Sequence, residues 1–193
     1  MTNVMRMFIC SFLLIVVSGC AFTPHEVQMN AMAPRLASDI GAGITVGLRF
    51  VDDRESSTVG QRGAGMQGAD VSASSLLSHV DVQSRQILAD KGFTVTDYNN
   101  NEEADVKLTI SIRAFRFFIE TGFWTGANNV DVIMKSEARK GVDDFENTYR
   151  FNNEERILVV PDGDGIDQML NAALLDVLTQ MAADRDLYKF LAS

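Results

Sequence analysis

Cysteine is scarce in this chain, and so is proline. Of the 193 residues, two are cysteine, both near the amino terminus at Cys10 and Cys20, and three are proline. No cysteine pair is therefore available to join distant parts of a folded domain, which excludes a disulfide-stapled scaffold. The fold must be stabilised by packing and hydrogen bonds alone.

Positive charge is also scarce. The chain carries 17 lysines and arginines against 26 aspartates and glutamates, for a formal net charge of −9. Nucleic-acid binding depends on basic side chains that displace counterions from phosphates, so we expect no nucleic-acid partner. The two histidines, His25 and His79, have no cysteine or second histidine at metal-ligand spacing. The sequence therefore predicts no metal site and no cofactor.

Catalytic motifs are missing as well. The chain contains no G-x-S-x-G, and its acidic residues are scattered in predicted turns and on polar helix faces. Asp52, Asp53 and Glu55 cluster where a predicted strand ends, and a periplasmic hydrolase that uses them is one alternative. Acidic side chains in loops are far more often ordinary solvated surface. We therefore predict that the protein is not an enzyme.

The apolar run at the amino terminus is too short to cross a membrane. Met7 to Val17 is eleven uncharged residues, or about 16 Å of helix against a hydrocarbon core of about 30 Å. The run follows Arg6 and ends at the small residues Ser18 and Gly19, an order typical of a cleaved signal peptide. We therefore predict that residues 1–19 are removed.

The end of this run resembles a bacterial lipobox, Val17-Ser18-Gly19-Cys20. The resemblance implies that Cys20 becomes the first residue and that its thiol is lipidated. At about 0.8 kcal/mol per buried methylene, two or three acyl chains anchor a protein durably. An ordinary secretory signal, in which Cys20 is incidental, is the alternative. Ala21 stands where an aspartate would favour the inner membrane in enterobacterial-type sorting, so the resemblance implies the periplasmic face of the outer membrane.

Residues 20–43 differ in composition from the rest of the chain. They carry two of the three prolines and mix small with polar residues, which predicts a lipidated, flexible tether with one short strand at 25–29. Residues 44–193 are enough for one domain with a sizeable core and too few for two. We predict a single periplasmic domain there.

The residue pattern of this domain predicts an α+β fold. Alternating apolar residues predict strands at 44–51, 93–98, 105–119 and 130–139, and through Phe145, Tyr149 and Phe151. Apolar stripes predict helices at 74–91 and from Ile166 to Met181. Residues 52–71 are interpreted as a loop or an edge hairpin. Because short loops join the long strands, we expect an antiparallel β-sheet with two amphipathic helices packed on one face.

Three stretches of this domain carry a family resemblance. "ADVKLTISIRAF", "NNVDVIMKSEARK" and "LNAALLDVLTQMAADRDLYKFL", behind a lipobox, resemble the YajG-type lipoproteins of Gram-negative bacteria. The resemblance runs from about Cys20 to Leu191 and implies an antiparallel sheet with two helices on one face. It supplies no catalytic residues, and only Cys20 transfers, as the lipid site.

The sequence Asp162-Gly-Asp-Gly165 resembles the start of a calcium loop. The ligand positions that should follow are occupied by Ile166 and Ala173, neither of which can bind calcium. We therefore interpret Asp164 as the residue that caps the last helix.

Aromatic residues gather at one predicted strand end. Phe115, Phe117, Ile119, Phe123 and Trp124 follow Lys107, Ser111 and Arg113 on the face that these polar residues mark as outward. Aromatic residues on a partly wet surface often anchor a partner. A second core layer, covered by the tether or by residues 52–71, is the alternative that the sequence leaves open.

The sequence thus predicts a lipid-anchored envelope protein without catalytic activity. The leading hypothesis is an accessory or scaffold that binds another envelope protein or a cell-wall component through the aromatic strand end. The alternative is a carrier or chaperone that accepts a lipid or glycan in a groove between the helices and the sheet.

Overall fold

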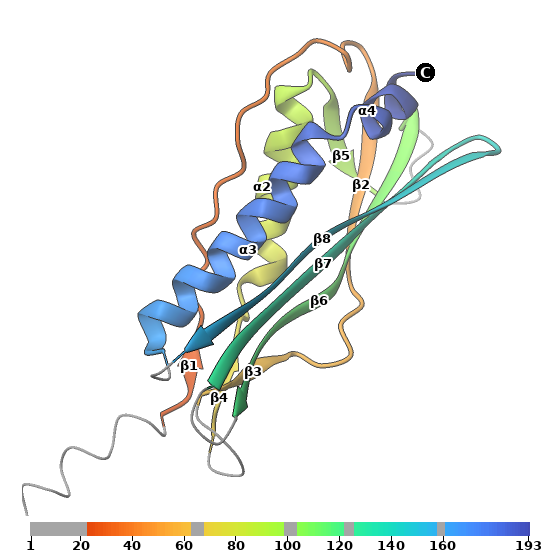
Figure 1. Cartoon of the computed structure of the whole chain (residues 1–193). Helices are drawn as coiled ribbons and strands as arrows, with labels where there is room; N and C mark the ends of the chain where they lie inside the picture. The colour runs from red at the N-terminus through yellow and green to blue at the C-terminus, as the bar shows by residue number, and fades with distance from the viewer. Residues whose placement is uncertain (1–22, 63–67, 99–103, 122–125, 158–160) are drawn as a thin grey trace, which may run out of the picture.

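The structure is a computed structural model that describes residues 23–62, 68–98, 104–121, 126–157 and 161–193 (Figure 1). Within these ranges it contains one eight-stranded sheet and three helices. The elements in chain order are β1 His25–Glu26, β2 Thr45–Asp52, β3 Thr58–Arg62, β4 Ala69–Ser72, α2 Leu76–Asp90, β5 Thr94–Asp97, β6 Val106–Thr121, β7 Gly126–Lys140, β8 Asp143–Ile157, α3 Gly163–Ala183 and α4 Arg185–Ala192.

The sheet is mixed. The long strands β6, β7 and β8 form an antiparallel meander. β2 lies parallel to both β5 and β6. β3 pairs antiparallel with β4 and meets β6 where Gly60 faces Phe117, and β1 lies parallel to β4. The α+β class is confirmed, but the sheet is not the antiparallel one that loop lengths suggested.

Two connections explain the parallel pairs. Between β2 and β5 the chain passes through β3, β4 and α2, which together return it to the end of the sheet where β2 began. β5 has only four residues, so a short connection suffices to bring the chain back to the start of β6. Short loops therefore do not require antiparallel neighbours here.

The helices occupy one face and one end of the sheet. α2 and α3 lie side by side across the same face, and α4 lies at the end of the molecule where β7 turns into β8 (Figure 1). α4 is a third helix that the sequence pattern did not predict, and its Phe190 ring stacks on Phe145 of β8 with ring centroids 5.6 Å apart.

Aspartates begin both carboxyl-terminal helices. Asp162 Oδ1 accepts a hydrogen bond from the Gly165 N–H at 2.9 Å and caps α3. The expected cap, Asp164, lies in the first turn instead. Asp184 Oδ1 accepts hydrogen bonds from two backbone N–H groups of α4 at 3.0 Å, so the residue that ends α3 also begins α4.

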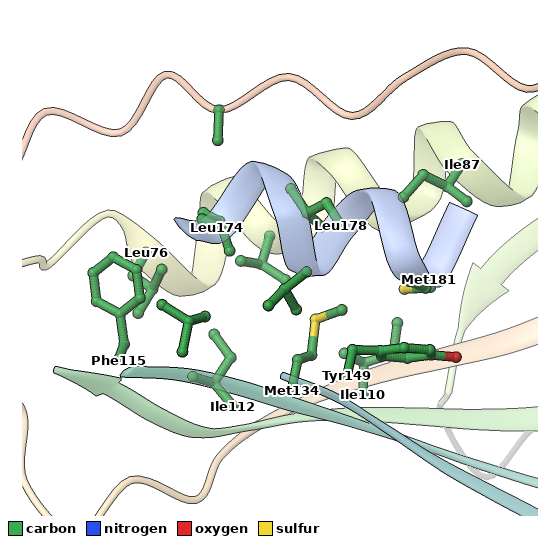
Figure 2. Packing of buried hydrophobic residues seen from close by; sticks show 14 of the residues in the cluster. Leu76, Ile87, Ile110, Ile112, Phe115, Met134, Tyr149, Leu174, Leu178 and Met181 are labelled. Atoms are coloured by element: carbon green, nitrogen blue, oxygen red, sulfur yellow. The ribbon is translucent and has the colours of Figure 1, made fainter. Parts of the chain in front are cut away.

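The hydrophobic core fills the space between the helices and the sheet. Leu174, Leu178 and Met181 of α3 face Ile112 and Met134 of the sheet (Figure 2), and all five are at most 2 % exposed. Burying each such side chain contributes about 1.5–3 kcal/mol. A carrier would need its groove in this interface, and these side chains occupy it.

Among the described helices, none is long and apolar enough to span a membrane.

Candidate functional site

Cys20 and the signal peptide lie outside the described residues, so lipidation stays a prediction. The chain that follows is described from Thr23 onward. Residues 25–33, here called the latch segment, were assigned by composition to the flexible tether. In the structure they run along α2 and α3, and Val27 and Ala31 are 1 % and 4 % exposed. The latch segment is therefore part of the folded body.

β1 begins the latch segment at the edge of the sheet. His25 and Glu26 align with Val71 and Ser72 of β4. The Glu26 carboxylate accepts hydrogen bonds from Ser72 Oγ at 2.5 Å and from the backbone N–H and the hydroxyl of Ser74 at 2.6 Å. These bonds hold the pKa of Glu26 below its ordinary value, and the bond from Ser72 has the largest effect. Glu26 thus ties the latch segment to the residues that lead into α2.

Asn171 of α3 holds the middle of the latch segment. Its side-chain oxygen accepts hydrogen bonds from the N–H groups of Asn30 at 2.6 Å and Ala31 at 3.0 Å. Its Nδ2 donates to the carbonyl oxygens of Gln28 and Asp167, both at 2.8 Å. An amide side chain has two acceptor and two donor positions, and all four are used here. Asn171 is 6 % exposed, so its side chain is buried and all of its hydrogen-bonding positions have partners.

Both histidines of the chain also hold the latch segment. His25 Nε2 donates to Asp167 Oδ1 at 2.6 Å. Its ring packs so closely on the start of α3 that a Cβ added to Gly163 would lie 2.7 Å from it. His79 of α2 is half-buried and its Nε2 donates to the Ala31 carbonyl at 2.6 Å. Because a carbonyl oxygen only accepts, His79 carries the proton on Nε2.

Sequence reasoning missed this site. Its one usable signal was Asn171, a polar residue beside the apolar stripe of α3. The segment it binds shows no periodicity, because its backbone is held by side chains of α2 and α3 rather than by a neighbouring strand over most of its length.

The described part of the aromatic strand end, Phe115, Phe117 and Ile119, lies in or against the core. In β6 the pairing with β7 shifts between Ile112 and Ala114, where Arg113 is the extra residue. Such a bulge reverses the inward and outward positions that follow. Phe115 and Phe117, which strict alternation places outward, are 1 % and 0 % exposed within the core cluster.

The remaining predicted patch residues are distributed differently. Ile119 is half-buried against the core, and Phe123 and Trp124 lie outside the described residues. The bulge instead turns Phe118 outward, and it is 42 % exposed. The structure thus does not bring the five predicted residues together on one described surface. The bulge that decides this leaves no mark in the alternation of the sequence.

The outer face of the sheet has a shallow hollow of about 290 Å³. In it the Arg49 guanidinium and the Lys107 ammonium lie 4.9 and 5.2 Å from the centre of the Tyr98 ring. Arg139 lines the same hollow and is ion-paired with Asp144 at 2.8 Å. Its lining residues include no nucleophile beside a base, so the hollow offers charge but no evident chemistry.

The hydrolase alternative depends on Asp52 and Asp53, and both are ion-paired. Asp52 receives two hydrogen bonds from the Arg54 guanidinium, at 2.7 and 2.8 Å, which lower its pKa. Asp53 Oδ2 lies 3.4 Å from Arg113 Nε. The lowered pKa of Asp52 makes this carboxylate poorly suited to general-acid work. Across the described part of the chain, no three His, Cys, Asp or Glu residues are grouped to hold a metal ion.

Comparison with known proteins gives a family and a fold. Residues 32–192 match the model of a family described as uncharacterised lipoprotein. No curated protein sequence matches the chain. A crystal structure of a Xanthomonas campestris protein of the DUF330 family superposes with a TM-score of 0.57 at 10 % identity, covering 86 % of this chain and 96 % of that one.

A second structure has a similar fold. It is described as a neuraminyllactose-binding hemagglutinin homolog from Helicobacter pylori, with a TM-score of 0.52 at 10 % identity, and the match covers 85 % of this chain and 98 % of that one. At such identities both likenesses concern the fold alone.

Proposed function

Since this chain belongs to the uncharacterised lipoprotein family that its YajG-type resemblance indicated, we propose that it is a lipid-anchored accessory protein of the bacterial envelope. Cys20 carries the lipid, the folded body faces the periplasm from the outer membrane, and the protein binds another envelope protein or a cell-wall component without catalysing a reaction.

The latch segment is the observation that carries this proposal. It begins five positions after Cys20 and is joined to β4, α2 and α3 by hydrogen bonds of 2.5–3.0 Å. A lipid on Cys20 would therefore be connected almost directly to the core of the domain. This construction suits a protein whose task depends on its place at a membrane.

The other described features fit an accessory better than the alternatives. The acids that a hydrolase would use are ion-paired with Arg54 and Arg113. The interface that a lipid or glycan carrier would need to open is filled by core side chains such as Leu178 and Met134. A partner is best accommodated at the β6–β7 end, where Phe118 is exposed and where we propose that Phe123 and Trp124 contribute.

Metabolic labelling with palmitate tests the anchor. The wild-type protein should incorporate the label and stay with membranes in a high-salt wash, whereas Cys20→Ser should incorporate none. A wild-type protein that carries no label and leaves the membrane in salt would contradict the proposal.

In-cell photocrosslinking tests the partner surface. A photoreactive residue at position 118 or 124 should give one reproducible protein or glycan adduct in cells that produce the lipidated protein. The control position, Val142, is 96 % exposed at the opposite end of the sheet and should not give it. The same adduct at all three positions, or no adduct at 118 and 124, would count against this surface.

A further inference from the structure

The number of residues between Cys20 and the latch segment limits how far the body can lie from a membrane. Four residues, 21–24, separate Cys20 from His25. Five Cα-to-Cα steps span at most about 18 Å. A flexible tether that ended only at residue 43 would span up to about 80 Å by the same rule. The latch segment therefore changes the reach of the anchor about fourfold.

The latch segment also fixes which end of the body is anchored. β1, β4, the start of α3, and the ends of β6 and β7 at Thr121 and Gly126 lie together at one end of the molecule (Figure 1). The β7–β8 turn and α4 lie toward the other end. β7 runs between these ends for 15 residues, so they are about 45 Å apart.

From these two facts we infer that the end of the domain carrying β1 and the start of α3 faces the bilayer that holds the lipid, within about 18 Å of it, while the β7–β8 turn points away. This inference rests on the proposed lipidation of Cys20. The partner surface proposed around Phe118 lies near this same end, so a partner bound there would lie close to the membrane.

The charge of the anchored end affects how close this end can lie to the lipid headgroups. The strand and helix ends here carry a group of exposed acids: Glu26, Asp70, Glu154, Glu155, Asp162 and Asp164. The basic residues in the sequence of these strand ends are Arg62, the last residue of β3, and Arg156, next to the last residue of β8. Anionic headgroups repel such an end within the Debye length of about 8 Å. This end should therefore be held a short distance from the headgroups by its linker rather than be pressed against them.

Energy transfer to labelled lipids tests this orientation. The mature lipidated chain has no free thiol, because Cys10 leaves with the signal peptide and Cys20 is acylated. Asp164→Cys at the start of α3 and Val142→Cys at the β7–β8 turn can each carry one fluorescent donor. The full lipidated protein is placed in vesicles of phosphatidylethanolamine and phosphatidylglycerol whose headgroups carry an acceptor.

We expect the donor at position 164 to be strongly quenched and the donor at 142 to be quenched several-fold less. Adding Asn171→Ala and His25→Ala, which release the latch segment, should reduce the difference between the two positions. Equal quenching in protein whose Cys20 lipid is verified by mass spectrometry would overturn the orientation alone. A protein without lipid on Cys20 would overturn the proposed function and the orientation together.

Discussion

Replacing Asn171 by alanine should detach the latch segment while leaving the sheet intact. The substitution removes four hydrogen bonds, three of them to the backbone of the latch segment. Alanine is a good helix former, so α3 itself should not be disturbed. Any loss of stability therefore reports the attachment of the latch segment.

The size of the effect follows from the burial of each partner. Ala31 is 4 % exposed, so its N–H has little access to water and is left unpaired at a cost of about 1–3 kcal/mol. Asn30 and Gln28 are exposed, so water replaces the lost partner and each bond costs about 0.5–1.5 kcal/mol. The total is about 2–6 kcal/mol while the latch segment stays in place. If the latch segment detaches as a unit before the rest of the domain unfolds, the free energy of global unfolding falls by less than this total.

Hydrogen exchange at single amides separates these outcomes. The N–H groups of Val27, bonded to the Ser72 carbonyl at 2.8 Å, and of Ala31 should lose protection in Asn171→Ala. The protection of the Ile110 N–H in β6 should fall only by the amount that corresponds to the change in global stability. Gln168→Ala, an exposed substitution on the same helix, is the matched control and should stay within about 0.5 kcal/mol of wild type. Unchanged protection of the Ala31 N–H in Asn171→Ala would contradict an attachment of the latch segment through Asn171.

Four further substitutions test other parts of the fold. Gly60→Ala would place a Cβ 1.8 Å from the Phe117 carbonyl oxygen, so β3 must move and the melting temperature should fall; an unchanged value would disprove this close approach. Phe117→Ser removes a side chain with 0 % exposure and should cost about 3–5 kcal/mol, whereas Phe118→Ser should cost under about 1 kcal/mol; equal costs in urea unfolding would contradict the bulge. Burial alone would raise the pKa of Asp184, but hydrogen bonds from α4 and Asn147 keep it below its ordinary value, so its stabilisation is complete above about pH 4 and is lost as the pH falls through the folded value. Urea unfolding between about pH 5 and pH 2 should show this loss, and Asp184→Asn should flatten it.

Strong local periodicity made the helices and long strands predictable. The stripe from Ile166 to Met181 predicts α3 within a few residues, because burial on one helix face repeats every 3.6 positions. The alternation in β6 and β7 likewise identifies both strands. The pairing order was not predictable, because it depends on how α2 and the four-residue β5 return the chain across the sheet.

The candidate site was harder to predict than the fold. The latch segment is held by contacts that are distant in sequence, such as that between Ala31 and Asn171, which are 140 positions apart. Its own composition therefore indicates only a loop. The prediction that Phe115 and Phe117 face outward was wrong for another reason, since one extra residue at Arg113 exchanges the two faces of β6. Neither feature produces a periodic signal.

Lipidation of Cys20 can be measured as the mass of the amino-terminal peptide of protein extracted from cell membranes. We predict a peptide that begins at Cys20 and is heavier by a diacylglycerol and an amide-linked fatty acid. A peptide that still contains residues 1–19, or one that begins elsewhere with an unmodified thiol at Cys20, would contradict it.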